Sequence, residues 1–104
     1  MSMKITPKHY DTLKGLFESA LRDEVERLKG REGLPQTVKA LIEHHEAAYK
    51  QGGLTERRMR FDLYWWVNRR RPELHEWSNE VYRYANDDHK ETAIKRVLQE
   101  LKAG

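Results

Sequence analysis

Residues 54–71, LTERRMRFDLYWWVNRRR, decide how this chain folds, because they combine six arginines with a dense group of apolar and aromatic residues. Six arginines against Glu56 and Asp62 give the segment a formal charge of about +4, whereas the whole chain carries +3. The basic charge is therefore local. A helix of this composition must place its aromatic side chains in a core and keep its guanidinium groups at the surface.

We expect residues 55–70 to form the third of five helices. Thr55 is a good N-cap residue, and Pro72 disfavours helical geometry in the residue before it, so these two positions bound the helix. The predicted inner stripe is Met59, Leu63, Trp66 and Val67, with Phe61, Tyr64 and Trp65 extending the apolar surface nearly all round. A helix that is apolar on most sides is expected to lie at the centre of the fold.

Apolar residues at three- and four-residue steps predict four more helices in the rest of the chain. Three of them are predicted over 7–29, 74–84 and 87–101, with N-caps at Thr6 and at Asn86 or Asp87. The fourth has its inner face between Val38 and Tyr49 and ends at Gly52-Gly53. No segment shows the period-two alternation of a half-buried strand. The chain is therefore predicted to be an all-α bundle of about five helices without a sheet. It is expected to form one domain over 1–104, with a flexible N-terminus at 1–5.

The composition argues against several classes of protein. The 104-residue chain has no cysteine, which excludes disulfides and thiolate metal sites. No apolar run approaches the roughly 18 residues of a membrane span, and the N-terminal segment lacks the apolar core of a signal peptide. We therefore expect a soluble cytoplasmic protein without a membrane partner. Met1-Ser2 reads either as a natural start or as an expression scar before Met3.

The histidines do not form the pattern of a helical metal site. Such a site needs two histidines one turn apart, as in His-Glu-x-x-His, so that both nitrogens face one ion. His44 and His45 are adjacent and would point about 100° apart on a helix, while His9, His75 and His89 are scattered. Solvated or capping histidines are expected, without a bound metal or other cofactor.

The residue sets of other catalytic sites are also missing from the sequence. None of the serines Ser2, Ser19 and Ser78 lies in a Gly-x-Ser-x-Gly elbow, and there is no glycine-rich phosphate loop. The paired acids Asp87 and Asp88 directly precede an apolar-periodic helix, where carboxylates favour the positive end of the helix dipole. They are interpreted as capping residues, and we expect no enzymatic activity.

The candidate partner-binding residues are the arginines of the central segment, Arg57, Arg58, Arg60, Arg69, Arg70 and Arg71. The last three lie at a predicted helix C-terminus, which cations stabilise, so they have a purely structural explanation. Arg57 and Arg58 lie in the first turn, where the helix dipole disfavours them, which indicates a partner or a nearby acidic residue. The candidate acidic neighbours are Glu73, Glu76 and Glu80, or Asp23, Glu24 and Glu26.

Nucleic-acid binding is the alternative for the same arginines, because clustered positive charge also attracts phosphates. A helix-turn-helix arrangement is disfavoured, since the recognition helix would spend most of its surface on apolar residues. Binding of single strands stays open, because an exposed Tyr64 or Trp65 could stack on bases. We expect these aromatic side chains to belong to the core instead.

The chain contains four short patterns that are informative together. They are Thr6-Pro7-x-His9-Tyr10, Tyr49-x-x-Gly52, Arg60-Phe61-Asp62-Leu63-x-Trp65 and Tyr84-x-Asn86-Asp87-Asp88-His89-x-x-Thr92-Ala93-Ile94-Lys95. Together they resemble a family of small bacteriophage and prophage proteins without an assigned activity. The family pattern has an aliphatic residue where this chain has Lys90, and this chain is longer between Leu16 and Tyr49. The resemblance implies a phage or mobile-element origin, hence the cytoplasm of a bacterial host, and it brings no catalytic residues.

The closing pattern is expected to act as a structural clamp at the start of the last helix. The residues assigned to this clamp and to a polar network around it are Asp62, Tyr84, Asn86, Asp87, Asp88, His89 and Thr92. Asn86 or Asp87 would accept free N–H groups of the last helix, while His89 and Thr92 would face the helix at 55–70. We hypothesise that Arg60 or Asp62 meets Tyr84, Asp87 or His89 there. A ligand pocket at the same place is the alternative.

The sequence thus predicts a compact, non-enzymatic protein that works by binding a macromolecule. The favoured interpretation is a phage-type accessory or regulatory factor that engages a host or phage protein. This class includes inhibitors of bacterial defence systems such as anti-CRISPR proteins, a step that rests on the implied origin and small size alone. A nucleic-acid-binding module and a helical homodimer are the alternatives.

Overall fold

The computed structural model describes residues 5–81 and 85–104, and within these residues it contains five α-helices and no strand. The helices are α1 (Pro7–Leu28), α2 (Val38–Gln51), α3 (Glu56–Arg70), α4 (Glu73–Val81) and α5 (Asp87–Ala103). The predicted all-α bundle is confirmed. The helix predicted over 74–84 extends into residues 82–84, which lie outside the described residues.

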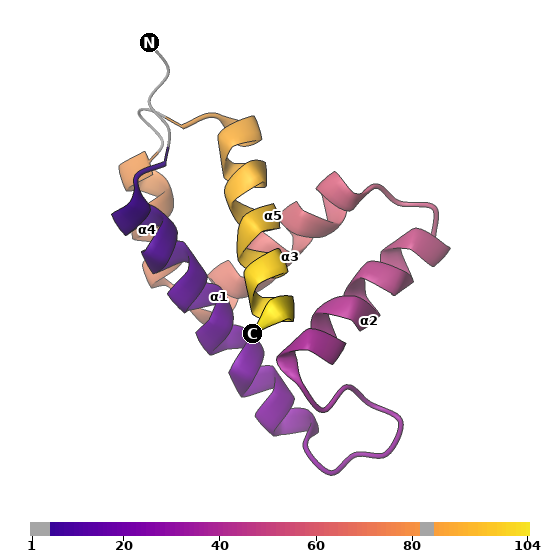
Figure 1. Ribbon diagram of the computed structural model, residues 1–104. Coiled ribbons are helices and arrows are strands. Elements are labelled where there is room, and N and C mark those ends of the chain that lie inside the picture. The colour runs from indigo at the N-terminus through magenta and orange to yellow at the C-terminus, as the bar shows by residue number, and fades with distance from the viewer. Residues whose placement is uncertain (1–4, 82–84) are drawn as a thin grey trace.

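The helices are arranged around a central pair, α1 and α3. α1 and α5 lie side by side and run in the same direction, with α2 on the other flank of α5 (Figure 1). α3 crosses behind α1 and α5 in this view. Both α1 and α3 contact every other helix of the described chain, so the arginine-rich helix is central, as its apolar surface predicts.

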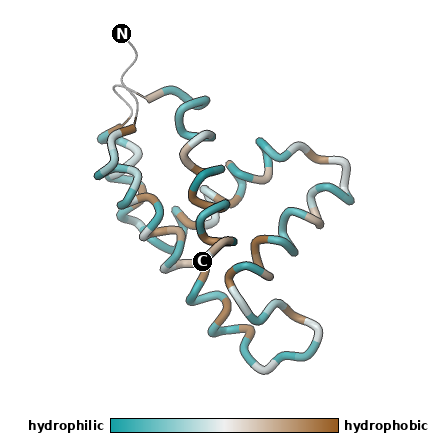
Figure 2. Tube along the Cα trace, in the orientation of Figure 1, coloured by the Kyte–Doolittle hydropathy of each residue, from teal (hydrophilic) through white to brown (hydrophobic). Residues whose placement is uncertain are grey.

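One hydrophobic core is shared by all five helices. Hydrophobic residues recur along the helices between hydrophilic ones, which gives each helix one side to bury (Figure 2). The largest fully buried side chains are Leu13, Phe17, Leu21, Ile42, Val67, Leu74, Val81, Ile94 and Val97. Ile5 also packs against this core, although the sequence places it in a flexible N-terminus. Residues 1–4 of that segment lie outside the described residues.

The burial of two tryptophans of α3 differs from the prediction. Trp66, which belongs to the predicted inner stripe, is only half-buried, while Tyr64 is buried as expected, with its ring 6.5 Å from that of Phe17 in α1 and 6.3 Å from that of Trp77 in α4, measured between centroids. Burial raises the pKa of the Tyr64 hydroxyl. Trp65, which we expect in the core, is instead 53% exposed. With helices on several sides of α3, one narrow face is left open to solvent.

Local signals in the sequence set the helix ends. The N-cap side chains of Thr6, Thr37, Thr55 and Asn86 each accept a hydrogen bond from a backbone N–H three residues later. At the other ends, Gly30 and Gly53 adopt φ angles of +80° and +73°, which side-chain-bearing residues avoid. The predicted caps at Thr6, Thr55 and Asn86 are confirmed.

We predict that Phe17→Ala lowers the free energy of unfolding by about 3–5 kcal/mol, because it removes a fully buried ring at the junction of α1 and α3. Trp65→Ala removes a larger ring from the exposed face of α3 and is expected to cost under about 1 kcal/mol. Urea denaturation followed by far-UV circular dichroism measures both. Equal losses for the two variants would contradict this assignment of the core.

Candidate functional site

Two arginines of α3 are held by carboxylates, chiefly those of α5. Arg57 Nη1 lies 2.9 Å from Asp88 Oδ1 and 2.5 Å from Glu91 Oε1, and its hydrogen bond with Asp88 raises the pKa of Arg57. Arg60 Nη1 lies 2.6 Å from Glu91 Oε2, and its Nη2 lies 3.0 Å from Glu56 Oε2. The side chains of Arg60 and Glu91 are only 11% and 20% exposed. Glu91 therefore joins α3 to α5 through a largely desolvated ion pair.

These contacts correct the acidic partners predicted for the first turn of α3. The sequence suggests carboxylates within 23–26 or 73–80 for Arg57 and Arg58. The structure gives Arg57 the carboxylates of α5, while Arg58 Nε lies 3.7 Å from Asp62 Oδ2 on its own helix. The positive charge that the helix dipole disfavours in this turn is thus offset within the molecule.

The three arginines at the C-terminal end of α3 differ in their contacts. Arg71 forms an ion pair with Asp23 of α1. The Arg70 guanidinium carbon lies 4.0 Å from the centroid of the Trp66 ring, a cation–π contact. Arg69 is exposed and forms no ion pair with any residue that the structure describes. Arg71 therefore links the end of α3 to α1, while Arg69 and Arg70 are exposed and accessible to a partner.

Trp65 is the largest exposed apolar side chain of α3. Its ring meets the buried Tyr64 edge-on, with centroids 5.3 Å apart and an interplanar angle of 87°. Arg58, Phe61 and Arg69 lie seven and four residues from Trp65 along the helix, so they share its face. We call these four residues, Arg58, Phe61, Trp65 and Arg69, the Trp65 surface.

The residues of the C-terminal pattern cap α5. Asn86 Oδ1 accepts from His89 N at 2.9 Å, and His89 Nδ1 accepts from Asn86 N at 3.3 Å, which together form a capping box. Thr92 Oγ1 donates to the Asp88 carbonyl at 2.9 Å. Asp87 is exposed in the first turn. The predicted capping role is confirmed for Asn86, whereas Asp87 and Asp88 lie in the first turn and the Asp88 carboxylate pairs with Arg57.

The polar network hypothesised between α3 and this pattern is replaced by other contacts. Asp62 Oδ2 accepts a 2.7 Å hydrogen bond from the Tyr49 hydroxyl of α2, which raises the pKa of Tyr49. Arg60 bonds carboxylates and makes no hydrogen bond with His89 in the described chain. Tyr84 lies outside the described residues. Arg60 therefore meets α5 at Glu91, beyond the hypothesised Asp87 and His89.

His89 and Thr92 also point in a different direction from the predicted one. They line a groove with Pro7 and Tyr10 of α1, whereas the sequence suggests that they face α3. The reason is that Glu91 occupies the α3-facing side of this turn, and neighbouring residues of a helix point in different directions.

Glu91 is not a defined position of any pattern in the sequence, yet it pairs with both Arg57 and Arg60 and so joins α5 to α3 together with Asp88. A spacing signal for it does exist. Asp88 and Glu91 are three residues apart, and so are Arg57 and Arg60, which places each pair on one face of its helix. Two carboxylates and two guanidinium groups with matched spacing can meet across a helix pair.

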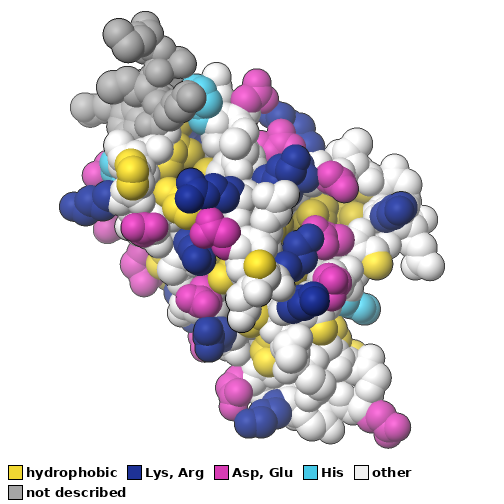
Figure 3. Space-filling view, viewed as in Figure 1, with side chains coloured by type: hydrophobic (Ala, Val, Ile, Leu, Met, Phe, Trp, Pro, Cys, Tyr) yellow, Lys and Arg dark blue, Asp and Glu magenta, His cyan; other side chains and the backbone are white. Residues whose placement is uncertain are grey.

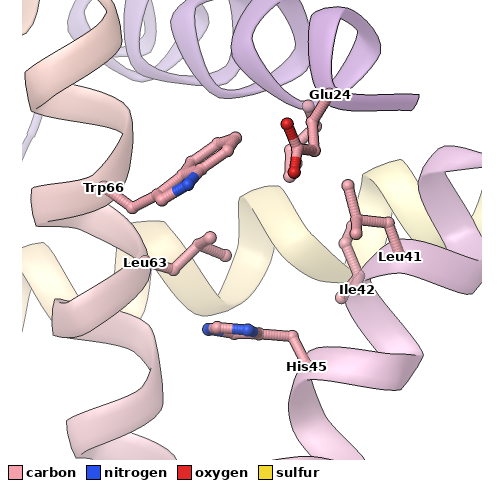
Figure 4. Close-up of a pocket in the computed structure, with 7 residues that line it drawn as sticks. Glu24, Leu41, Ile42, His45, Leu63 and Trp66 are labelled. Carbon is pink, nitrogen blue, oxygen red and sulfur yellow. The ribbon is translucent and has the colours of Figure 1, made fainter. Parts of the chain in front are cut away.

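A small pocket lies between α1, α2 and α3, and Figure 4 shows the side chains that converge on it. Its volume is about 120 Å³, and it is lined by Leu21, Glu24, Leu41, Ile42, His45, Leu63 and Trp66. His45 Nε2 is buried there without a hydrogen-bond partner among the described residues. Burial lowers the pKa of His45, so the imidazole is held in its neutral form.

Residues 5–81 and 85–104 contain no group of three or more histidine or acidic side chains placed to hold a metal ion. No helix in these ranges is long and apolar enough to cross a membrane.

Comparison of the chain with protein-family models, with curated proteins and with solved structures finds no significant match.

We predict that Glu91→Gln lowers the free energy of unfolding by about 1–3 kcal/mol, because it leaves the desolvated Arg60 without its closest carboxylate. Glu18→Gln is the matched control, since the Glu18–Arg22 pair is 39% and 70% exposed, and it is expected to cost under about 0.5 kcal/mol. Urea denaturation compares the two. A loss for Glu91→Gln no larger than that of the control would contradict a structural role for this pair.

Stability is also predicted to depend on the protonation of His45. Its pKa in the folded protein lies below the ordinary value of 6.5, so the unfolded chain binds the proton more readily. The contribution of neutral His45 to the free energy of unfolding should therefore be fully present above about pH 6.5 and decrease as the pH falls below that value. The loss at pH 5.5 relative to pH 7.5 should be smaller in His45→Gln, measured by urea denaturation at both pH values. The same pH dependence in both proteins would refute the assignment.

Proposed function

We propose that this protein is a small, non-enzymatic accessory or regulatory factor of phage or prophage type, which acts by binding another protein through the Trp65 surface. The observation that carries the proposal is the 53% exposure of Trp65 on the central helix. Tryptophan and arginine are the residues most often found at the energetic centre of protein interfaces. A side chain presented by a packed helix also loses little conformational freedom when a partner binds.

The distribution of charge favours a protein partner over a nucleic acid. Arg57, Arg60 and Arg71 are neutralised by carboxylates of the same molecule, and Arg58 also lies 3.7 Å from the Asp62 carboxylate. Of these six arginines, Arg69 and Arg70 are the two that form no ion pair with a described residue. On the face shown in Figure 3, basic and acidic side chains alternate without a large region of one sign. Nucleic-acid binding by phosphate contacts requires several basic groups that are free of internal partners.

The biological setting is proposed from the resemblance and from size. The C-terminal pattern at 84–95 resembles that of phage and prophage proteins, which supports action in the cytoplasm of a bacterial host. Small proteins that inhibit bacterial defence systems, such as anti-CRISPR proteins, belong to this class. The proposed partner is therefore a host or phage protein.

A nucleic-acid-binding module is the second candidate, and one observation favours it. Trp65 with Arg58 and Arg69 on either side resembles the stacking platforms that bind single strands, where a base lies on the ring and phosphates meet the guanidinium groups. The two candidates differ in their response to salt. Three phosphate contacts to a single strand would lower affinity about 30-fold between 0.1 M and 0.5 M salt, following the counterion-release slope.

We predict that affinity capture from nuclease-treated bacterial lysate recovers a specific protein with the wild-type chain and loses it with Trp65→Ala. A tryptophan at the centre of an interface contributes about 2 kcal/mol or more, equivalent to roughly 30-fold in Kd. Leu34→Ala is the matched control, because Leu34 is also exposed, at 38%, but lies in the loop between α1 and α2.

The two candidate functions give different results in this experiment. A protein partner should be retained by the wild type and by Leu34→Ala at 0.5 M NaCl. Capture that disappears after nuclease treatment or falls steeply with salt would favour nucleic acid. If Trp65→Ala captures the same protein as the wild type, the partner does not bind through the Trp65 surface and the proposal is contradicted.

A further inference from the structure

We infer that the pocket between α1, α2 and α3 is a binding site for a phenol-type ring, meaning one uncharged aromatic ring with a single hydroxyl group. None of the residues that line this pocket belongs to the Trp65 surface. The inference is therefore independent of the proposed function.

The size and walls of the pocket fit a single ring. Side chains from three helices face one space, with Glu24 from α1, Ile42 and His45 from α2, and Leu63 and Trp66 from α3 (Figure 4). Its volume of about 120 Å³ is close to that of engineered apolar cavities, about 150 Å³, that admit benzene. Ligand sites of this kind combine apolar walls with a few placed polar groups.

The polar group in this pocket is the imidazole of His45. Its Nε2 is buried and finds no hydrogen-bond partner in the described part of the chain. A nitrogen of a neutral imidazole either donates or accepts, depending on the tautomer. A hydroxyl group can do both, so it complements either tautomer, whereas an ammonium can only donate and a carboxylate can only accept.

The surrounding charges favour a neutral ligand. Both Glu24 carboxylate oxygens already accept hydrogen bonds from Arg27, at 2.8 Å and 2.7 Å, so Glu24 is not free to hold a cation. Arg70 already lies over the Trp66 ring at 4.0 Å and makes the cation–π contact there. An anion would have to enter beside the Glu24 carboxylate. Burial in an apolar pocket disfavours either charge further.

Two sources can supply this chemistry, a free small phenol or the tyrosine side chain of a partner protein. The probes are therefore 4-methylphenol with toluene as its matched control, and the peptide acetyl-Gly-Tyr-Gly-amide with its Phe analogue. Each is titrated into the full-length chain at pH 7.5, and the methyl signals of Leu41, Ile42 and Leu63 are followed by ¹H–¹³C NMR.

We expect 4-methylphenol to shift these methyl signals saturably, with a Kd on the order of 1 mM, in keeping with its few heavy atoms. Toluene should bind at least about 10-fold more weakly. A parallel preference for the tyrosine peptide over its Phe analogue would assign the pocket to a partner's side chain. Binding of 4-methylphenol alone would assign it to a small molecule.

Two variants test the mechanism. His45→Leu keeps the volume but removes Nε2, so it should bind 4-methylphenol and toluene about equally. Leu41→Trp fills the rim of the pocket and should abolish the shifts at Ile42 and Leu63. The inference is overturned by toluene binding as tightly as 4-methylphenol to the wild type, or by the absence of saturable shifts with every probe. The wild-type comparison decides this even where a variant does not fold.

Discussion

The ion pair between Arg60 and Glu91 is the contact that reconciles the two demands placed on α3. This helix must bury Leu63, Tyr64 and Val67 in the core while it carries five arginines, with a sixth, Arg71, at its C-cap. A guanidinium group that loses water without gaining a carboxylate is strongly destabilising. The acidic residues of α5 therefore have to lie against the first half of α3, and Asp23 of α1 against its end. The packing of α1 and α5 against α3 removes water from these guanidinium groups, and the ion pairs offset the cost.

The same pairings shape the surface that is left for function. Four of the six arginines that the sequence marks as candidate binding residues form ion pairs within the molecule, while the face of α3 around Trp65 is open to solvent. Trp65 is exposed on a helix that packs against all four other helices of the described chain, so its backbone is held in place. Most arginines of the basic segment therefore make contacts within the fold. The proposed binding role is assigned chiefly to Trp65.

Local signals explain why the helices could be predicted and the contacts between them could not. Thr55, Pro72 and Asn86 act within one turn of themselves, so their effect is readable in the sequence. The partners of Arg57 lie 31 and 34 residues away and depend on how α5 docks. Which of the neighbouring rings Tyr64, Trp65 and Trp66 is buried depends equally on where the other helices lie. The pocket at His45 requires three helices to meet, which no spacing within one helix reveals.

The central claim is that Arg60 and Glu91 stabilise the fold by meeting each other, and a double-mutant cycle tests it most directly. Arg60→Met, Glu91→Gln and the double variant are compared with the wild type by urea denaturation at low salt. The account predicts a coupling free energy of about 1–3 kcal/mol, so that the double variant loses less stability than the sum of the single losses. Losses that add to within about 0.3 kcal/mol would show that the two side chains act independently, and would contradict the account.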